Sequence, residues 1–92
     1  GEEFLKEIKS KMPGDLFLSN FSAHNREIQI TGIAKDTYSI AEFGKGLEQL
    51  EVTNSSFISN ITNVEDYYTF AMNLTLKDVM IDGEDSIQEQ EK

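Results

Sequence analysis

The spacing of hydrophobic positions along the chain changes from helical to alternating, and then does so a second time. Residues 2–12 have the i, i+3, i+4 spacing of an amphipathic helix, with an apolar stripe of Phe4, Leu5, Ile8 and Met12. Pro13 followed by Gly14 predicts the end of this helix. Residues 16–23 and 27–34 alternate instead, which predicts a hairpin around the polar turn 24–26.

Two features of this hairpin predict local irregularities. Leu16 and Leu18 share a face with Phe21 only if one extra residue is inserted, so we expect a β-bulge near Ser19. Gly32, inside the return strand, marks a bulge or a close approach of backbone.

The second half of the chain repeats this order. Asp36 can cap a helix over 37–51, with an apolar stripe of Ile40, Ala41, Phe43, Leu47 and Leu50. We expect a loop at 53–56, a polar strand at 57–64 and a turn at 65–66. The clearest strand is 67–77, whose inward positions are Tyr68, Phe70, Met72, Leu74 and Leu76.

A helix–strand–strand order that occurs twice predicts an α+β fold, a circularly permuted ferredoxin-like αββαββ arrangement. Its four-stranded antiparallel or mixed sheet has 27–34 and 67–77 in the centre, 16–23 and 57–64 at the edges, and both helices on one face. Tyr67, Thr69 and Ala71 then lie on an exposed face, where an aromatic residue favours a protein interface. An unpaired edge strand also invites a partner strand.

Composition and charge narrow the classes of function. The 92 residues suit one domain, with a first helix at 1–12, a core at 13–81 and an acidic tail at 82–92 that we expect to be disordered. The formal net charge is −9, which disfavours nucleic acid and anionic lipid, so we expect no nucleic-acid partner and no direct membrane contact. The sequence has no cysteine, and no apolar run in it is long enough to span a membrane.

Three candidate chemical sites lack residues that their chemistry requires. Gly44-Lys45-Gly46 lacks the hydroxyl residue of a P-loop and falls inside a predicted helix, so we expect Gly44 to serve close packing and Gly46 to lie on the surface. Residues 78–89 approach a calcium loop, but Met80 occupies a ligand position. His24 is the only histidine and lies in a turn. We therefore predict no enzyme activity, no cofactor and no metal.

The hydrophobic positions also resemble a known family. The matching pattern is Met12-Pro13, Leu16-x-Leu18-x-x-Phe21, Ile28-x-Ile30-x-Gly32-x-Ala34, Ile40-Ala41-x-Phe43, Leu47-Glu48, Phe57 and Tyr68-x-Phe70-x-Met72-x-Leu74. Over residues 4–77 it resembles the extracytoplasmic domain of PilN, a type IV pilus assembly protein. The L and M proteins of type II secretion and PilO have similar architecture and remain alternatives, as does a small-molecule-sensing ferredoxin-like module.

The resemblance implies a non-enzymatic scaffold in the alignment subcomplex of the pilus. Its implied partners are a PilO-like protein, a second copy of itself and a PilM-like protein bound through a cytoplasmic segment outside this sequence; pilin is a further candidate. The implied location is the extracytoplasmic side of the bacterial cytoplasmic membrane, with an anchoring transmembrane helix upstream and residues 2–12 as the end of a stalk. We expect the partner interface to include Phe4, Ile8, Phe57, Ile58, Ile61 and Tyr67.

Overall fold

The computed structural model describes residues 2–78, which form two helices and four strands. Their order is α1 (Glu2–Ser10), β1 (Leu16–His24), β2 (Glu27–Ala34), α2 (Thr37–Glu48), β3 (Thr53–Val64) and β4 (Tyr67–Leu76). The strands form one sheet in the order β1-β2-β4-β3, and every neighbouring pair is antiparallel. This confirms the ferredoxin-like αββαββ arrangement, with β2 and β4 in the centre and β1 and β3 at the edges.

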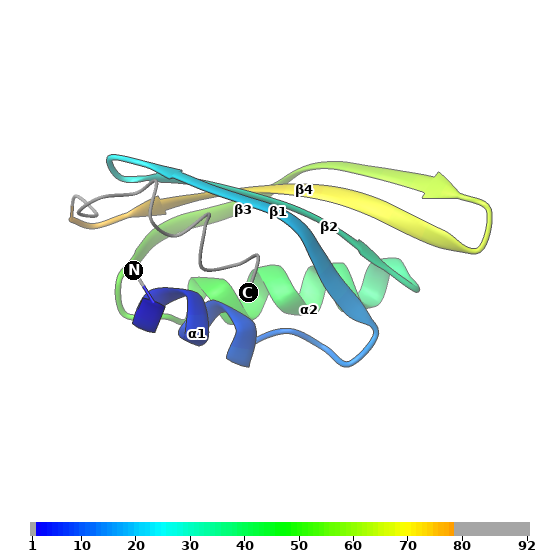
Figure 1. Ribbon diagram of the computed structural model, residues 1–92, viewed down its shortest axis with the longest axis horizontal. Coiled ribbons are helices and arrows are strands. Elements are labelled where there is room, and N and C mark those ends of the chain that lie inside the picture. Colours follow the sequence, from blue (N-terminus) through cyan, green and yellow to red (C-terminus); the bar gives the residue numbers. More distant parts are fainter. Residues whose placement is uncertain (1, 79–92) are drawn as a thin grey trace.

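Both helices lie on one face of the sheet, as Figure 1 shows. The core fills the space between the two layers, and ten of its side chains are below 2% exposed: Phe21, Phe43, Ile8, Leu16, Ile28, Ile30, Ile40, Leu47, Met72 and Leu74. The strand residues among them point toward the helices because residues i and i+2 of a strand share a face. Ala41 was expected in this stripe, but it is exposed at the side of α2 that faces β3.

The opposite face of the sheet has no helix over it among the described residues, and we call it the open face. Cross-strand pairing assigns its residues, because directly paired residues point to the same side. It consists of Phe17, Asn20, Ser22 and His24 of β1, Glu27, Gln29, Thr31 and Ile33 of β2, Tyr67, Thr69, Ala71, Asn73 and Thr75 of β4, and Ser55, Phe57, Asn60, Thr62 and Val64 of β3.

The hairpins have the predicted irregularities. The β1–β2 register shifts between Leu18 and Asn20, which places the expected bulge at Ser19. Gly32 pairs with Leu18 beside this bulge, and a Cβ atom on it would lie 2.3 Å from the carbonyl oxygen of Phe17. The glycine therefore allows the close approach of backbone that its position in the strand predicted.

Two boundaries predicted near the end of α2 differ from those in the structure. The helix begins at the predicted cap, where Asp36 Oδ1 accepts from the amide of Ser39 at 2.9 Å. It ends at Glu48, three residues before the predicted end, and the predicted loop at 53–56 is wrong because β3 begins at Thr53. The buried Thr53 hydroxyl donates to the carbonyl of Leu47 at 2.8 Å and so binds the start of the strand to the end of the helix.

The end of α1 also differs from its predicted position, and part of the predicted C-terminal region is not described. α1 ends at Ser10 rather than 12, and the amides of Lys11 and Met12 close a tighter last turn onto the carbonyls of Ile8 and Lys9. Neither helix within residues 2–78 is long and apolar enough to cross a membrane. The predicted tail at 82–92 and all of the calcium-like pattern after Asp78 lie outside the described residues.

Candidate partner-binding site

The edge strand β3 is the longest strand of the sheet, with 12 residues, and it pairs with β4 along one side only. It contains no charged residue and no proline. Natural edge strands commonly carry lysine, proline or bulges that prevent pairing with another chain. Of these devices β3 has only two register shifts, and the stretches 55–58 and 60–64 between and beyond them are regularly paired. A partner strand therefore meets no charge and no proline along this edge.

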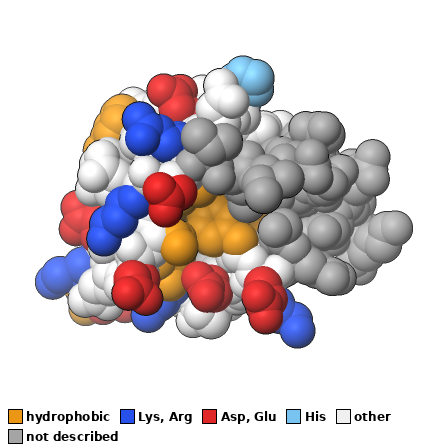
Figure 2. Space-filling model, turned by 90° about the vertical axis from the view of Figure 1, so that its left-hand side faces the viewer, with side chains coloured by type: hydrophobic (Ala, Val, Ile, Leu, Met, Phe, Trp, Pro, Cys, Tyr) orange, Lys and Arg blue, Asp and Glu red, His pale blue; other side chains and the backbone are white. Residues whose placement is uncertain are grey.

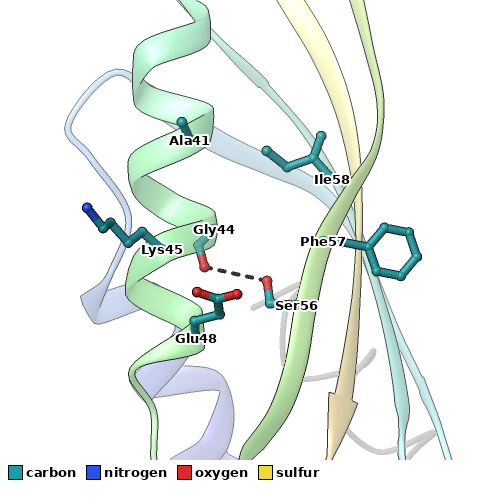
Figure 3. A pocket seen from close by; sticks show the side chains of 7 residues that line it. All are labelled: Ala41, Gly44, Lys45, Glu48, Ser56, Phe57 and Ile58. Carbon is teal, nitrogen blue, oxygen red and sulfur yellow. Dashed lines mark hydrogen bonds between the residues drawn. The ribbon is translucent and has the colours of Figure 1, made fainter.

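A shallow groove runs between α2 and β3 along the same edge. It has a volume of about 240 Å³ and is lined by Ala41, Gly44, Lys45, Glu48, Ser56, Phe57 and Ile58. In Figure 3 the Ile58 side chain points toward α2, whereas Phe57 points away from the groove on the other side of the strand. The Ser56 hydroxyl donates to the carbonyl oxygen of Gly44 at 3.4 Å. The α2–β3 groove thus lies beside exposed apolar side chains, with a charged rim from Lys45 and Glu48.

The two glycines of α2 have different surroundings from those expected. A Cβ atom on Gly44 would lie 3.6 Å from the terminal carbon of Met72 and 3.9 Å from Ile58, which are ordinary contacts. Gly46 is the more tightly packed position: it is half-buried, and its added Cβ atom would lie 3.1 Å from Cβ of Lys11. The expectation of a surface position for Gly46 is therefore wrong, because the segment after α1 packs against it.

The expected interface residues lie in different parts of the molecule. Phe57 and Ile61 are 56% and 39% exposed on β3, and Ile58 lies between them, half-buried against the core. Tyr67 is on the open face and is 40% exposed. Phe4 packs edge-on against Phe21 of β1, at the opposite edge of the sheet, with ring centroids 6.5 Å apart.

Ile8 of α1 is fully buried, so its side chain packs inside this chain. The apolar stripe that predicted Ile8 as a contact is instead the stripe that holds α1 on the sheet.

The hydrophobic pattern did not predict the α2 side of the groove. Ala41 and Gly44 are small residues three positions apart, so they lie on neighbouring positions of one helix face. This pattern was a usable signal, since small side chains leave room between a helix and a neighbouring strand. Polar Ser56 was missed because it fell in the segment predicted as a loop.

The two groups with shifted pKa values, Asp15 and Tyr38, are not among the residues that line the groove. The Ser39 hydroxyl donates to Asp15 Oδ1 at 2.6 Å and holds the pKa of that carboxyl below its usual value. The Tyr38 hydroxyl donates to Glu42 at 3.0 Å, which raises the pKa of the tyrosine. Both contacts fix the first half of α2 and its neighbouring turn. Among residues 2–78, no group of three or more His, Cys, Asp or Glu side chains could hold a metal ion.

Comparison with known proteins supplies the family. Residues 3–76 match the family model of the fimbrial assembly protein PilN, and the match covers both helices and all four strands apart from Glu2. Comparison with curated proteins gave no match, and comparison with solved structures gave none. Because the matched segment covers well over half of the sequence and the whole described fold, this chain belongs to the PilN family of fimbrial assembly proteins.

Proposed function

We propose that this domain is a non-enzymatic scaffold of the type IV pilus alignment subcomplex, and that it acts by pairing with a PilO-like partner along β3. Membership of the PilN family supports a role in fimbrial assembly. The observation that carries the proposal is the edge strand itself, which has 12 residues, no charge and no proline. In the same proposal, the domain works on the extracytoplasmic side of the membrane.

The exposed backbone of β3 provides the affinity in this arrangement. An added strand would hydrogen-bond to the amides and carbonyls on the outer side of β3, where no strand of the described chain pairs. Alternate side chains of β3 would then meet the partner on both faces, with Ile61 on the helix side and Phe57 on the open face. Backbone pairing sets the geometry, and these two side chains add apolar contact.

The α2–β3 groove provides selectivity. A strand added to β3 projects every second side chain toward the helix side, over the space between Gly44 and Ile58. Ala41 and Gly44 leave room there for an apolar side chain, and Lys45 and Glu48 border the space with opposite charges. A partner strand with an apolar residue at that register is favoured over one with a charged residue, since the groove wall is mostly uncharged.

The test is to measure binding of the PilO-like protein from the same organism to four variants of this chain. Ile61→Lys puts a charge on the edge, and Gly44→Leu fills the groove; we expect each to weaken binding at least about tenfold. Val52→Lys is the matched control for charge, because Val52 is 42% exposed but lies outside β3. Gly44→Ala is the control for the groove, because its Cβ atom makes only ordinary contacts.

Hydrogen exchange locates the contact independently of the variants. Amides of β3 should become protected when the partner binds, while those of β1, at the other edge, should not change. Wild-type affinity in Ile61→Lys, together with unchanged exchange in β3, would exclude this edge as the interface. Absence of any binding by the wild-type chain would remove the proposed scaffold function itself.

A further inference from the structure

The hydrogen bonds at the end of β4 determine which backbone groups of β3 point away from the sheet. Successive residues of an antiparallel strand direct their N–H and C=O groups to alternate sides. The amide of Leu76 donates to the carbonyl of Arg26, on the β2 side, at 2.8 Å, and the amide of Lys77 donates to the carbonyl of Val52, on the β3 side, at 2.9 Å. Because β4 pairs with β2 without a register shift, all odd-numbered residues of β4 direct their backbone groups toward β3.

Four residues of β3 therefore direct their backbone groups outward, where no other strand of the described chain lies. They are the residues that pair with even-numbered residues of β4, namely Ser56, Ile58, Ile61 and Asn63. Their side chains lie on the helix side, since their partners in β4 include the buried Met72 and Phe70. Two of them, Ser56 and Ile58, also line the α2–β3 groove, so the outward backbone and the groove belong to the same part of the strand.

The bulge in the middle of β3 leaves this outer side clear. The register shifts between Ile58 and Asn60, which places the extra residue at Ser59. The Ser59 hydroxyl donates to the carbonyl of Ala71 on β4 at 3.2 Å, so its side chain is held by the strand that is already paired. The edge thus has two short runs, 56–58 and 61–63, which a single short extended segment can reach.

The uncovered open face favours an antiparallel partner over a parallel one. Antiparallel sheets commonly have one face in water, whereas parallel strands occur almost only where both faces are covered. In an antiparallel pair, the residue opposite an outward residue of β3 exchanges both hydrogen bonds with it and has its side chain on the same face. The partner residue opposite Ile58, whose side chain points toward α2 in Figure 3, therefore bonds to the Ile58 backbone and directs its own side chain into the groove.

The groove determines the chemistry of that side chain. Ala41 and Gly44 leave about 240 Å³ between the helix and Ile58. The one hydroxyl in the groove lining, that of Ser56, already donates to the carbonyl oxygen of Gly44. A leucine or valine side chain would be buried there without leaving a polar group unpaired, whereas a charged one would lose water.

Charge complementarity adds a basic residue at one end of the partner segment. The turn that follows β3 has two exposed acids, Glu65 and Asp66, and residues 46–76 contain no Lys, Arg or His. At the start of β3, Lys45 and Glu48 border the groove with opposite charges, and Figure 2 shows both acidic and basic side chains at that end of the molecule. Because an antiparallel partner runs opposite to β3, its first residues lie beside the acidic turn, where Lys or Arg is favoured.

We propose that the β3 edge binds an extended segment that runs antiparallel to β3, begins with a basic residue beside Glu65 and Asp66, and places an apolar side chain opposite Ile58 in the α2–β3 groove. This inference rests on the strand pairing proposed above and adds the direction, the register and the side chains of the partner. A helix lying in the groove would cover the outward backbone groups of β3 without pairing them, so an extended segment is favoured.

The experiment measures binding of a capped peptide, Arg-Thr-Val-Thr-Leu-Thr-Ser, to the wild-type chain. Its valine and leucine are placed opposite Ile61 and Ile58, and its arginine beside the acidic turn. N-methylation of the leucine or valine amide should weaken binding at least about tenfold, because those amides bond to β3, whereas N-methylation of the threonine between them should not. The reversed sequence, Ser-Thr-Leu-Thr-Val-Thr-Arg, is the control of identical composition and should bind at least about tenfold more weakly.

Variants and hydrogen exchange test the register on the protein side. Gly44→Leu should weaken binding of the leucine peptide at least about tenfold but affect a peptide with alanine in its place less, and circular dichroism melts establish that the variant is folded. With the peptide bound, the amides of Ile58 and Ile61 should exchange more slowly, while those of Phe57 and Thr62, which face β4, should not change.

Three results would overturn the inference. Loss of binding on N-methylation of the threonine instead would mean a parallel strand, equal binding of the reversed peptide would remove the direction, and failure of the wild-type chain to bind the peptide would remove the extended segment itself. The proposed scaffold function is distinguished by the PilO-like protein. If that protein protects β3 while the peptide does not bind, only this inference fails, and if neither binds, both fail.

Discussion

Replacing Gly32 with alanine is the sharpest test of the packing between β1 and β2. The added Cβ atom would lie 2.3 Å from the carbonyl oxygen of Phe17 and 2.8 Å from the Phe70 ring. Phe70 is a buried core residue, and the carbonyl belongs to the backbone of β1, so neither can move away cheaply. The backbone conformation is not the obstacle, because no glycine among the described residues has a positive φ.

The loss of folding stability expected for Gly32→Ala follows from these two overlaps. Overpacking a well-packed core by one methyl group costs typically about 1–3 kcal/mol, and a clash with backbone places Gly32→Ala at about 3 kcal/mol. A domain of this size has about 4–12 kcal/mol of stability in total, so the loss is a large fraction of it. At about 4–8 °C per kcal/mol, the melting temperature should fall by about 12–24 °C.

The assay is urea unfolding followed by circular dichroism, with Gly14→Ala as the matched control. Gly14 has no atom within 4 Å of its added Cβ atom, so this variant should be as stable as wild type or gain about 0.4–1 kcal/mol from its less flexible unfolded chain. If Gly32→Ala unfolds at the same urea concentration as Gly14→Ala, with an unchanged m-value, the close approach of β1 to β2 is not as described.

Two further predictions concern a turn and an acid. Glu65 has φ 55°, a left-handed conformation that asparagine tolerates better than glutamate does. Glu65→Asn should therefore raise the free energy of unfolding by about 0.5–1 kcal/mol. Asp66→Asn is the control, because it makes the same charge change without relieving the conformation at residue 65. Ser39→Ala removes the hydrogen bond that lowers the pKa of Asp15. Because the pKa of Asp15 is lowered in the folded state, its ionised carboxylate stabilises the fold above the usual carboxyl pKa of about 3.9. This stabilisation is lost as the pH falls through the lowered pKa. Urea curves should therefore show Ser39→Ala less stable than wild type at pH 7 and a smaller difference at pH 3; a constant difference would contradict this role of Asp15.

The strand order and the bulge were predictable because the apolar residues of the core strands alternate clearly. Five alternating apolar residues in β4 predict a central strand, and the phase change between Leu18 and Phe21 predicts an inserted residue. Gly32 added to the prediction, since a glycine inside a strand commonly marks a bulge or a close approach of backbone. These signals are local, because each one comes from neighbouring residues within a single strand.

The start of β3 and the packing of Gly46 could not be predicted in the same way. Thr53, Ser55 and Ser56 have the composition of a loop, and they extend because Thr53 bonds to the end of α2 and the strand pairs with β4. Gly46 contacts Lys11, more than 30 positions away, and no periodicity encodes that contact. For the candidate site, the stripe of α1 was ambiguous between core and interface, and only the fold assigned Ile8 to the core.

The distribution of charge links solubility to assembly in this domain. An exposed sheet face and an uncharged edge are aggregation hazards in a monomer, and proteins commonly blunt them with lysine or glutamate. Here the charges are placed instead on the helices, the turns and the acidic stretch after β4, which leaves the strands free of all but Glu27. The net charge of −9 makes separate chains repel each other, yet a strand that paired with β3 as proposed would not have to desolvate any charge on β3. A domain that functioned alone would gain from lysines on β3 and on the open face. The absence of lysine and proline from β3 therefore supports the partner strand proposed for this edge.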